Sequence, residues 1–282
     1  MQQIGQGIYA ETGYRGGNVG FVITSEGVIL INTPMVPLEA RQWRDKIAEV
    51  TDQEVIYIIN TDYHPECIVG NYVFEAPVIA HELAWRKMKS YGDSFRQHLI
   101  DDFKDEPEMA AELKSFRIVT PQITLTDKMT LHEGNKVLEL IHVGGHTPAS
   151  IVVYIPEESV LFAGDVVVND AHPSMEEASS KEWLDALTYI RRPWVKAEII
   201  VPGEGEVCDR EATKKLSKYI RRLRAKVRAL YSTGHSRAEV VASVAEMVDF
   251  FSVTDEEGGE AMQRLKANAE RVYEEMKAVG EG

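Results

Sequence analysis

Short apolar runs alternate with amphipathic segments along the first two hundred residues. Apolar runs bounded by Gly, Pro, Asn or Asp predict buried strands, which we expect at residues 7–11, 20–24, 27–32, 55–59, 78–80, 118–125, 129–132, 136–143, 150–155, 160–162 and 198–201. Apolar residues at helical spacing predict helices at 37–50, 82–91 and 181–191, and the acidic stretch 93–114 is expected to be helical too. The pattern indicates an α/β chain with two sets of strands, each followed by helices.

After Cys208 the pattern becomes purely helical. We expect helices at 210–231, 238–250 and 257–278, and Ser236 followed by Glu239 indicates a capping box before the second of them. Apolar residues of this region must pack against the strands or pair two copies in a homodimer; they are Val240, Val241, Val244, Met247, Phe250 and Phe251. We therefore divide the chain into one domain at 1–207 and a helical C-terminal extension at 208–282.

Composition narrows the class of protein. The 282 residues carry a net charge of -14, which argues against nucleic-acid binding because that binding needs cations facing phosphates. Basic residues on one face of 210–231 are interpreted as a solvated surface, in preference to a docking surface for a partner or an anionic substrate. Two cysteines do not make a disulfide framework, no apolar run reaches membrane-spanning length, and the N-terminus lacks a signal-peptide pattern. We expect a cytoplasmic protein with no membrane partner.

Candidate metal ligands follow the apolar run 55–59. Asp62, His64, Glu66 and Cys67 fall within six positions of one another, and each can bind a metal ion. A strand end followed by a short loop can direct alternate side chains at one point. The segment therefore predicts a metal site, although a loop that only keeps its backbone shape is the alternative.

Four segments, in order, resemble motifs of the metallo-β-lactamase fold superfamily. Asp62, His64, Glu66 and Cys67 stand where that family has His, His, Asp and His. The other segments are Gly144-Gly145-His146-Thr147-Pro148, Phe162-Ala163-Gly164-Asp165 and Pro202-Gly203-Glu204-Gly205, the last with Glu204 in place of a His. The resemblance implies a four-layer αβ/βα sandwich in which loops at one edge carry the ligands.

The resemblance also implies which residues hold metal. The first site would consist of Asp62, His64 and His146, the second of Glu66, Cys67 and Glu204, with Asp165 bridging the two. Asn32 replaces an Asp that the family uses to support its ligands.

The substituted ligand set shifts from imidazole toward carboxylate, which suits Fe or Mn as well as Zn. The second set has no imidazole, and its carboxylates oppose the ionisation that a Cys67 ligand requires. We therefore expect one divalent metal more readily than two.

The resemblance implies a metal-dependent hydrolase that acts on a small ester-, thioester- or lactone-like substrate. Asp165 would orient the attacking water, Asp62 or Glu66 would accept a proton, and His172, in the loop after Asp165, would contact substrate. Weak or absent turnover of β-lactams is expected. Two alternatives stay open, namely a non-catalytic binding or assembly protein with a degenerate site, and a carboxylate-rich iron redox protein of the same fold.

Overall fold

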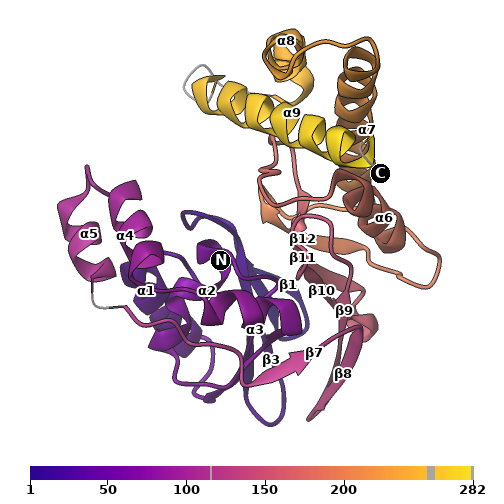
Figure 1. Ribbon diagram of the computed structural model, residues 1–282. Helices are drawn as coiled ribbons and strands as arrows, with labels where there is room; N and C mark the ends of the chain where they lie inside the picture. Colours follow the sequence, from indigo (N-terminus) through magenta and orange to yellow (C-terminus); the bar gives the residue numbers. More distant parts are fainter. Residues whose placement is uncertain (115, 253–257, 281–282) are drawn as a thin grey trace.

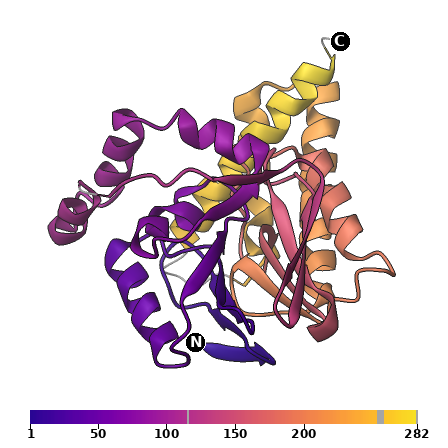
Figure 2. The same ribbon diagram turned by 90° about the horizontal axis from the view of Figure 1, so that it is seen from below.

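The structure, a computed structural model, describes residues 1–114, 116–252 and 258–280. Two β-sheets pack face to face, and helices cover the outer face of each (Figure 1). The same layers are visible after a quarter turn, with the early helices on one side and the C-terminal helices on the other (Figure 2). This four-layer αβ/βα sandwich with a C-terminal helical extension is the predicted fold.

The first sheet has seven strands in chain order, β1 to β7. They are Gln2–Gly5, Ile8–Glu11, Val19–Ile23, Val28–Ile31, Val55–Ile59, Val78–His81 and Ile123–Leu125. Neighbours from β1 to β4 pair antiparallel, whereas β4 to β7 pair parallel. The sequence pattern did not predict β1, because this short edge strand is polar and largely exposed.

The second sheet has five strands in the order β12-β11-β10-β9-β8. In chain order β8 to β12 are Lys128–Glu133, Lys136–His142, Ile151–Ile155, Val160–Val168 and Ile199–Glu204. Strands β11 and β12 run parallel and extend beyond the predicted ranges, since β11 continues through Gly164 at φ 50°. The register of the pair shifts on both sides of Gly164, and this irregularity lies next to Asp165.

The core lies between the sheets and under their outer helices. Apolar side chains of both inner faces form one buried cluster, which includes Ile29, Leu140 and Phe162. On the outer face of the first sheet, Trp43 of α1 is fully buried against Phe21. The helical segments on that side are α1 Pro37–Ala48, α2 Pro65–Ile68, η1 Val69–Val73, α3 Glu82–Lys89, α4 Asp93–Asp102 and α5 Pro107–Leu113.

The outer face of the second sheet is covered by the later helices. They are α6 Ser180–Ile190, α7 Arg210–Ser232, α8 Arg237–Ser243, η3 Ala245–Phe250 and α9 Gly258–Gly280. Val240, Val244, Met247 and Phe251 are buried in the same cluster as the outer face of this sheet. These side chains pack within one chain, so they give no support to a dimer. Across the described residues, no helix combines the length and the apolarity needed to cross a bilayer.

Candidate metal centre

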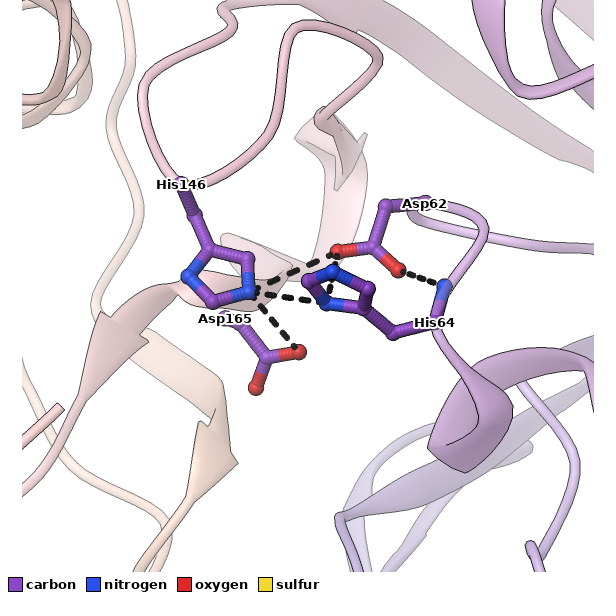
Figure 3. Close-up of side chains that lie close together, drawn as sticks. All are labelled: Asp62, His64, His146 and Asp165. Atoms are coloured by element: carbon purple, nitrogen blue, oxygen red, sulfur yellow. Dashed lines mark hydrogen bonds and ion pairs between the residues drawn. The ribbon is translucent and has the colours of Figure 1, made fainter. Parts of the chain in front are cut away.

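Four predicted ligands converge at one edge of the sandwich (Figure 3). Asp62 and His64 lie in the loop after β5, His146 in the loop between β9 and β10, and Asp165 in β11. One ligand atom from each residue can be chosen so that all four lie within 4.8 Å of one another. The residues are far apart in sequence, and the two sheets bring them together.

The donor atoms face a common point. His146 Nε2 lies 3.1 Å from His64 Nδ1, 3.9 Å from Asp62 Oδ2 and 3.8 Å from Asp165 Oδ2. His64 Nδ1 lies 3.8 Å from the same Asp62 oxygen. Two imidazole nitrogens and two carboxylate oxygens form a donor set that fits a divalent Zn, Fe or Mn ion.

Local hydrogen bonds shape the loop after β5. The Asp62 carboxylate accepts a hydrogen bond from the backbone N–H of His64 at 2.8 Å, and Pro65 then starts α2. At Thr61, the residue before Asp62, the Asn32 side chain accepts a hydrogen bond from the backbone N–H at 2.8 Å. The same side chain donates a hydrogen bond to the Thr61 hydroxyl at 2.9 Å. The neutral amide of Asn32 thus supports the loop at the position where the superfamily motif has an Asp.

Two glycines allow the other ligand loops to approach. Gly145, at φ 96°, lies where a Cβ would come within 2.6 Å of Trp183 Cα on α6. At Gly203 a Cβ would lie 2.0 Å from Asp165 Oδ1 and 2.6 Å from the Asp165 backbone nitrogen. Only glycine avoids these overlaps, so both positions serve the placement of His146 and Asp165.

Buried carboxyl groups dominate the electrostatics of the site. Burial and the nearby Asp62 raise the pKa of Asp165 well above its usual range, and burial likewise raises the pKa of Glu66. Burial and the neighbouring His64 lower the pKa of His146 to about 4. Burial opposes protonation of His64, but Asp62 and Glu66 outweigh it and raise the His64 pKa. Several acidic groups therefore share a site where a bound cation would relieve their repulsion.

The residues predicted to form a second metal site do not converge as the first four do. Of the residues that the structure describes, Glu66, Cys67 and Glu204 do not join the four-residue ligand group. Cys67 is 2% exposed, its sulfur lies 3.7 Å from the Thr61 hydroxyl oxygen, and burial raises its pKa well above the usual range. Glu66 lies beside the centre, with Oε1 3.9 Å from His64 Nδ1. Metal binding at this set stays a prediction.

Glu204 has a partner that the sequence did not indicate. Arg264 Nη1, on α9, lies 3.0 Å from Glu204 Oε1 and 2.7 Å from Oε2. Arg264 belongs to no sequence motif that would distinguish it from the other basic residues of the C-terminal helices. Only the packing of α9 brings it to Glu204.

His172 and Tyr63 have different surroundings. His172 Nδ1 lies 3.2 Å from the Tyr219 hydroxyl oxygen and Nε2 lies 2.8 Å from the Val248 carbonyl oxygen, so both ring nitrogens face the C-terminal extension. Its contact with substrate stays a prediction. Tyr63, which sequence reasoning did not select, packs edge-on against His64 and donates a hydrogen bond to Glu177.

Comparisons with known proteins agree with this geometry. A family model described as metallo-beta-lactamase superfamily matches residues 12–204. The chain is 22% identical over 189 residues to a type 2 metallo-beta-lactamase of Bacteroides fragilis, covering 66% of this chain and 67% of the relative. It is 21% identical over 228 residues to a linear primary-alkylsulfatase of a Pseudomonas species, covering 70% of this chain and 43% of the relative.

Solved structures show the same fold. A metallo-beta-lactamase from Pontibacter korlensis superposes with a TM-score of 0.60 at 22% identity, covering 78% of this chain and 97% of that one. The DIM-1 metallo-beta-lactamase gives a TM-score of 0.59 at 18% identity, with 78% and 95% coverage. The family match, the two-sheet fold and the converging ligands together show that this chain belongs to the metallo-β-lactamase superfamily.

Proposed function

We propose that the chain is a metal-dependent hydrolase that acts on a small ester-, thioester- or lactone-like substrate. The observation that supports it most is the convergence of Asp62, His64, His146 and Asp165, whose ligand atoms lie within 4.8 Å of one another. The similar proteins are named as a β-lactamase and an alkylsulfatase. Both names describe hydrolysis, although of different bonds, and we transfer to this chain only the reaction class.

Each residue of the site would have its own role in hydrolysis. A divalent metal held by the four ligands would polarise a carbonyl and lower the pKa of a bound water. Asp165, which lies on β11 across from the Asp62 loop, would orient the attacking water. Glu66, beside His64 at the same edge, would accept the proton that this water loses. Asp62 is the alternative proton acceptor, but its carboxylate is already engaged by the His64 backbone N–H.

The donor set argues against efficient β-lactam hydrolysis. Asp62 contributes an anionic oxygen where the superfamily motif has a neutral imidazole. An anionic donor reduces the positive charge that a bound water experiences, so the water should ionise less readily than at an all-histidine centre. We therefore favour activated acyl substrates, such as thioesters and lactones, whose carbonyl groups need a weaker nucleophile than an amide.

Hydrolysis assays test the proposal. Full-length protein loaded separately with Zn, Mn or Fe is offered a panel of p-nitrophenyl esters, acyl thioesters, lactones and a chromogenic β-lactam. We expect metal-dependent turnover of at least one ester, thioester or lactone, and a loss of about 100-fold or more in Glu66→Gln and in His146→Ala. Turnover that does not depend on metal would overturn the metal-dependent mechanism. Turnover of none of the panel would overturn the hydrolase and favour a binding protein. An oxygen-sensitive iron spectrum without hydrolysis would favour the redox alternative.

A further inference from the structure

An ion pair links the C-terminal helix α9 to the edge of the sandwich that carries the candidate metal centre. Arg264 contacts both oxygens of Glu204 through Nη1, at 3.0 and 2.7 Å. The same Nη1 donates to the His172 carbonyl oxygen at 3.0 Å, and Nη2 lies 2.8 Å from Glu260 Oε1. The guanidinium is therefore held by Glu204, by the His172 carbonyl group and by Glu260 of its own helix.

Glu204 lies on the strand next to the one that carries Asp165. It ends β12 and pairs in register with Val168 of β11, the strand that carries Asp165. The residue before it, Gly203, lies directly against the Asp165 carboxylate. Gly17 lies between this strand end and Glu66, since a Cβ at Gly17 would lie 3.2 Å from the Gly203 carbonyl oxygen and 3.7 Å from Glu66 Cβ. Two further carboxylates, Glu66 and Glu204, thus lie beside the four-ligand centre.

A positive charge would reduce the repulsion among these carboxylates, and the Arg264 guanidinium on α9 provides one. We propose that the Arg264–Glu204 ion pair takes the place of a second metal ion in this chain, so that the centre holds one metal and the C-terminal extension supplies the other cation. The inference rests on the proposed metal centre, because the pair matters only if the four-ligand site is occupied.

The chemistry of the pair supports this role. The contact between Arg264 Nη1 and the two oxygens of Glu204 is a charge-assisted interaction, which is stronger than a hydrogen bond between neutral groups. A divalent ion binding Glu204 would have to displace the guanidinium or accept its repulsion at close range. The Arg264 side chain is 30% exposed, so solvent weakens the pair, but three acceptors hold the guanidinium beside the carboxylate.

Counting bound zinc tests the proposal. Metal-free full-length protein is dialysed to equilibrium against a small excess of Zn²⁺, and zinc per chain is measured by elemental analysis. We expect one zinc in the wild type, two in Arg264→Gln, and one in the double variant Arg264→Gln/Glu204→Gln. The double variant separates a site at Glu204 from adventitious binding elsewhere.

Two further variants serve as controls. Lys266→Gln removes one positive charge from an exposed position on the same helix and should keep one zinc. Arg264→Lys keeps the charge and should also bind one zinc, so two zinc ions in folded Arg264→Lys would contradict the inference. Two zinc ions in the wild type, or one in folded Arg264→Gln, would overturn the inference while leaving the metal centre intact. No zinc in the wild type would instead overturn the metal centre itself, and the inference with it.

Discussion

Gly203 packs directly against Asp165. A Cβ at this position would lie 2.0 Å from the Asp165 carboxylate and 2.6 Å from its backbone nitrogen, both far inside van der Waals contact. Because β11 and β12 are parallel neighbours here, neither strand can move away without breaking their pairing. Glycine at position 203 therefore leaves the space that the Asp165 carboxylate occupies.

Gly203→Ala tests this relation. The added methyl group should displace Asp165 and reduce bound metal to less than about a tenth of the wild-type content, with an unfolding cost of roughly 1–3 kcal/mol typical of overpacking. Metal content and thermal unfolding, measured on the same preparation, provide the check. Gly92→Ala is the matched control, since a Cβ there meets nothing within 4 Å. Full metal content in Gly203→Ala would show that the strand pair adapts more freely than this packing implies.

Cys67 provides a second test at the residue scale. Its sulfur faces the Thr61 hydroxyl and it packs in a buried apolar cluster of the first half of the chain. Burial raises the pKa of the thiol, so the thiolate needed for ligation is disfavoured. Cys67→Ser should therefore retain one metal per chain, as elemental analysis would show. A variant that binds no metal but still folds would mean that Cys67 is a ligand of the main site.

The sequence predicted the four converging residues but not Arg264. The four converging residues could be found because each stands in a segment that resembles a family motif, as in Gly145-His146-Thr147-Pro148. Arg264 could not, because no local pattern distinguishes it from other basic residues and its role comes from the packing of α9. The ion pair of Glu204 was missed for the same reason.

At the scale of elements, the helix α9 joins the C-terminal extension to the sandwich. Leu265, Ala269 and Val272 face inward and are buried with residues of α6, α7 and β11 in one cluster. Asn268 donates to the Pro173 carbonyl oxygen at 2.8 Å, in the loop that follows β11. The helix therefore contacts both the outer helical layer and the loop next to the metal centre, with Arg264 one residue from the buried Leu265.

Leu265→Ala measures how strongly α9 is held. The side chain is fully buried, and its truncation should cost about 2–4 kcal/mol in the free energy of unfolding, or on the order of 5–10 °C in Tm. Differential scanning calorimetry would measure both. Lys266→Ala, exposed on the adjacent position, should change stability by less than about 0.5 kcal/mol. Equal effects of the two substitutions would contradict the packing of α9 onto the chain.

The periodicity of the sequence predicted most elements but not all of their ends. Strands β11 and β12 were predicted to be short because Gly164, Pro202 and Gly203 usually interrupt strands. In the structure the parallel pairing continues past them with shifts of register. This irregular stretch carries Asp165, one of the four converging residues, so the hydrophobic pattern alone did not describe the part of the sheet beside the candidate metal centre.

On the scale of the whole molecule, the two sheets meet at an edge where acidic groups are concentrated. Asp62 is almost fully buried, while Glu66 and Asp165 retain partial exposure beside it. Burial raises the pKa of Glu66 and of Asp165, and the nearby Asp62 carboxylate raises both further. A divalent metal at their common point would therefore stabilise the fold as well as supply the chemistry.

Removing metal should lower the thermal stability of the molecule. Ligand binding to the folded state adds about 2.7 kcal/mol when free metal is 100 times its Kd, so treatment with EDTA should lower Tm by roughly 5–10 °C and metal should restore it. Thermal unfolding with and without chelator gives the comparison. His64→Ala should show no response to either reagent, and a wild type that behaves in the same way would indicate that no metal is bound in the folded chain.

The metal content of the purified protein tests the central claim most directly. The wild type, expressed in medium containing Zn, Mn and Fe and passed over a desalting column, is analysed by inductively coupled plasma mass spectrometry beside His64→Ala and His146→Ala. Circular dichroism confirms that all three are folded. We predict close to one divalent metal per wild-type chain and less than about a tenth of that in either variant. Metal retained in both folded variants, or absent from the wild type and not taken up when supplied, would contradict the metal centre.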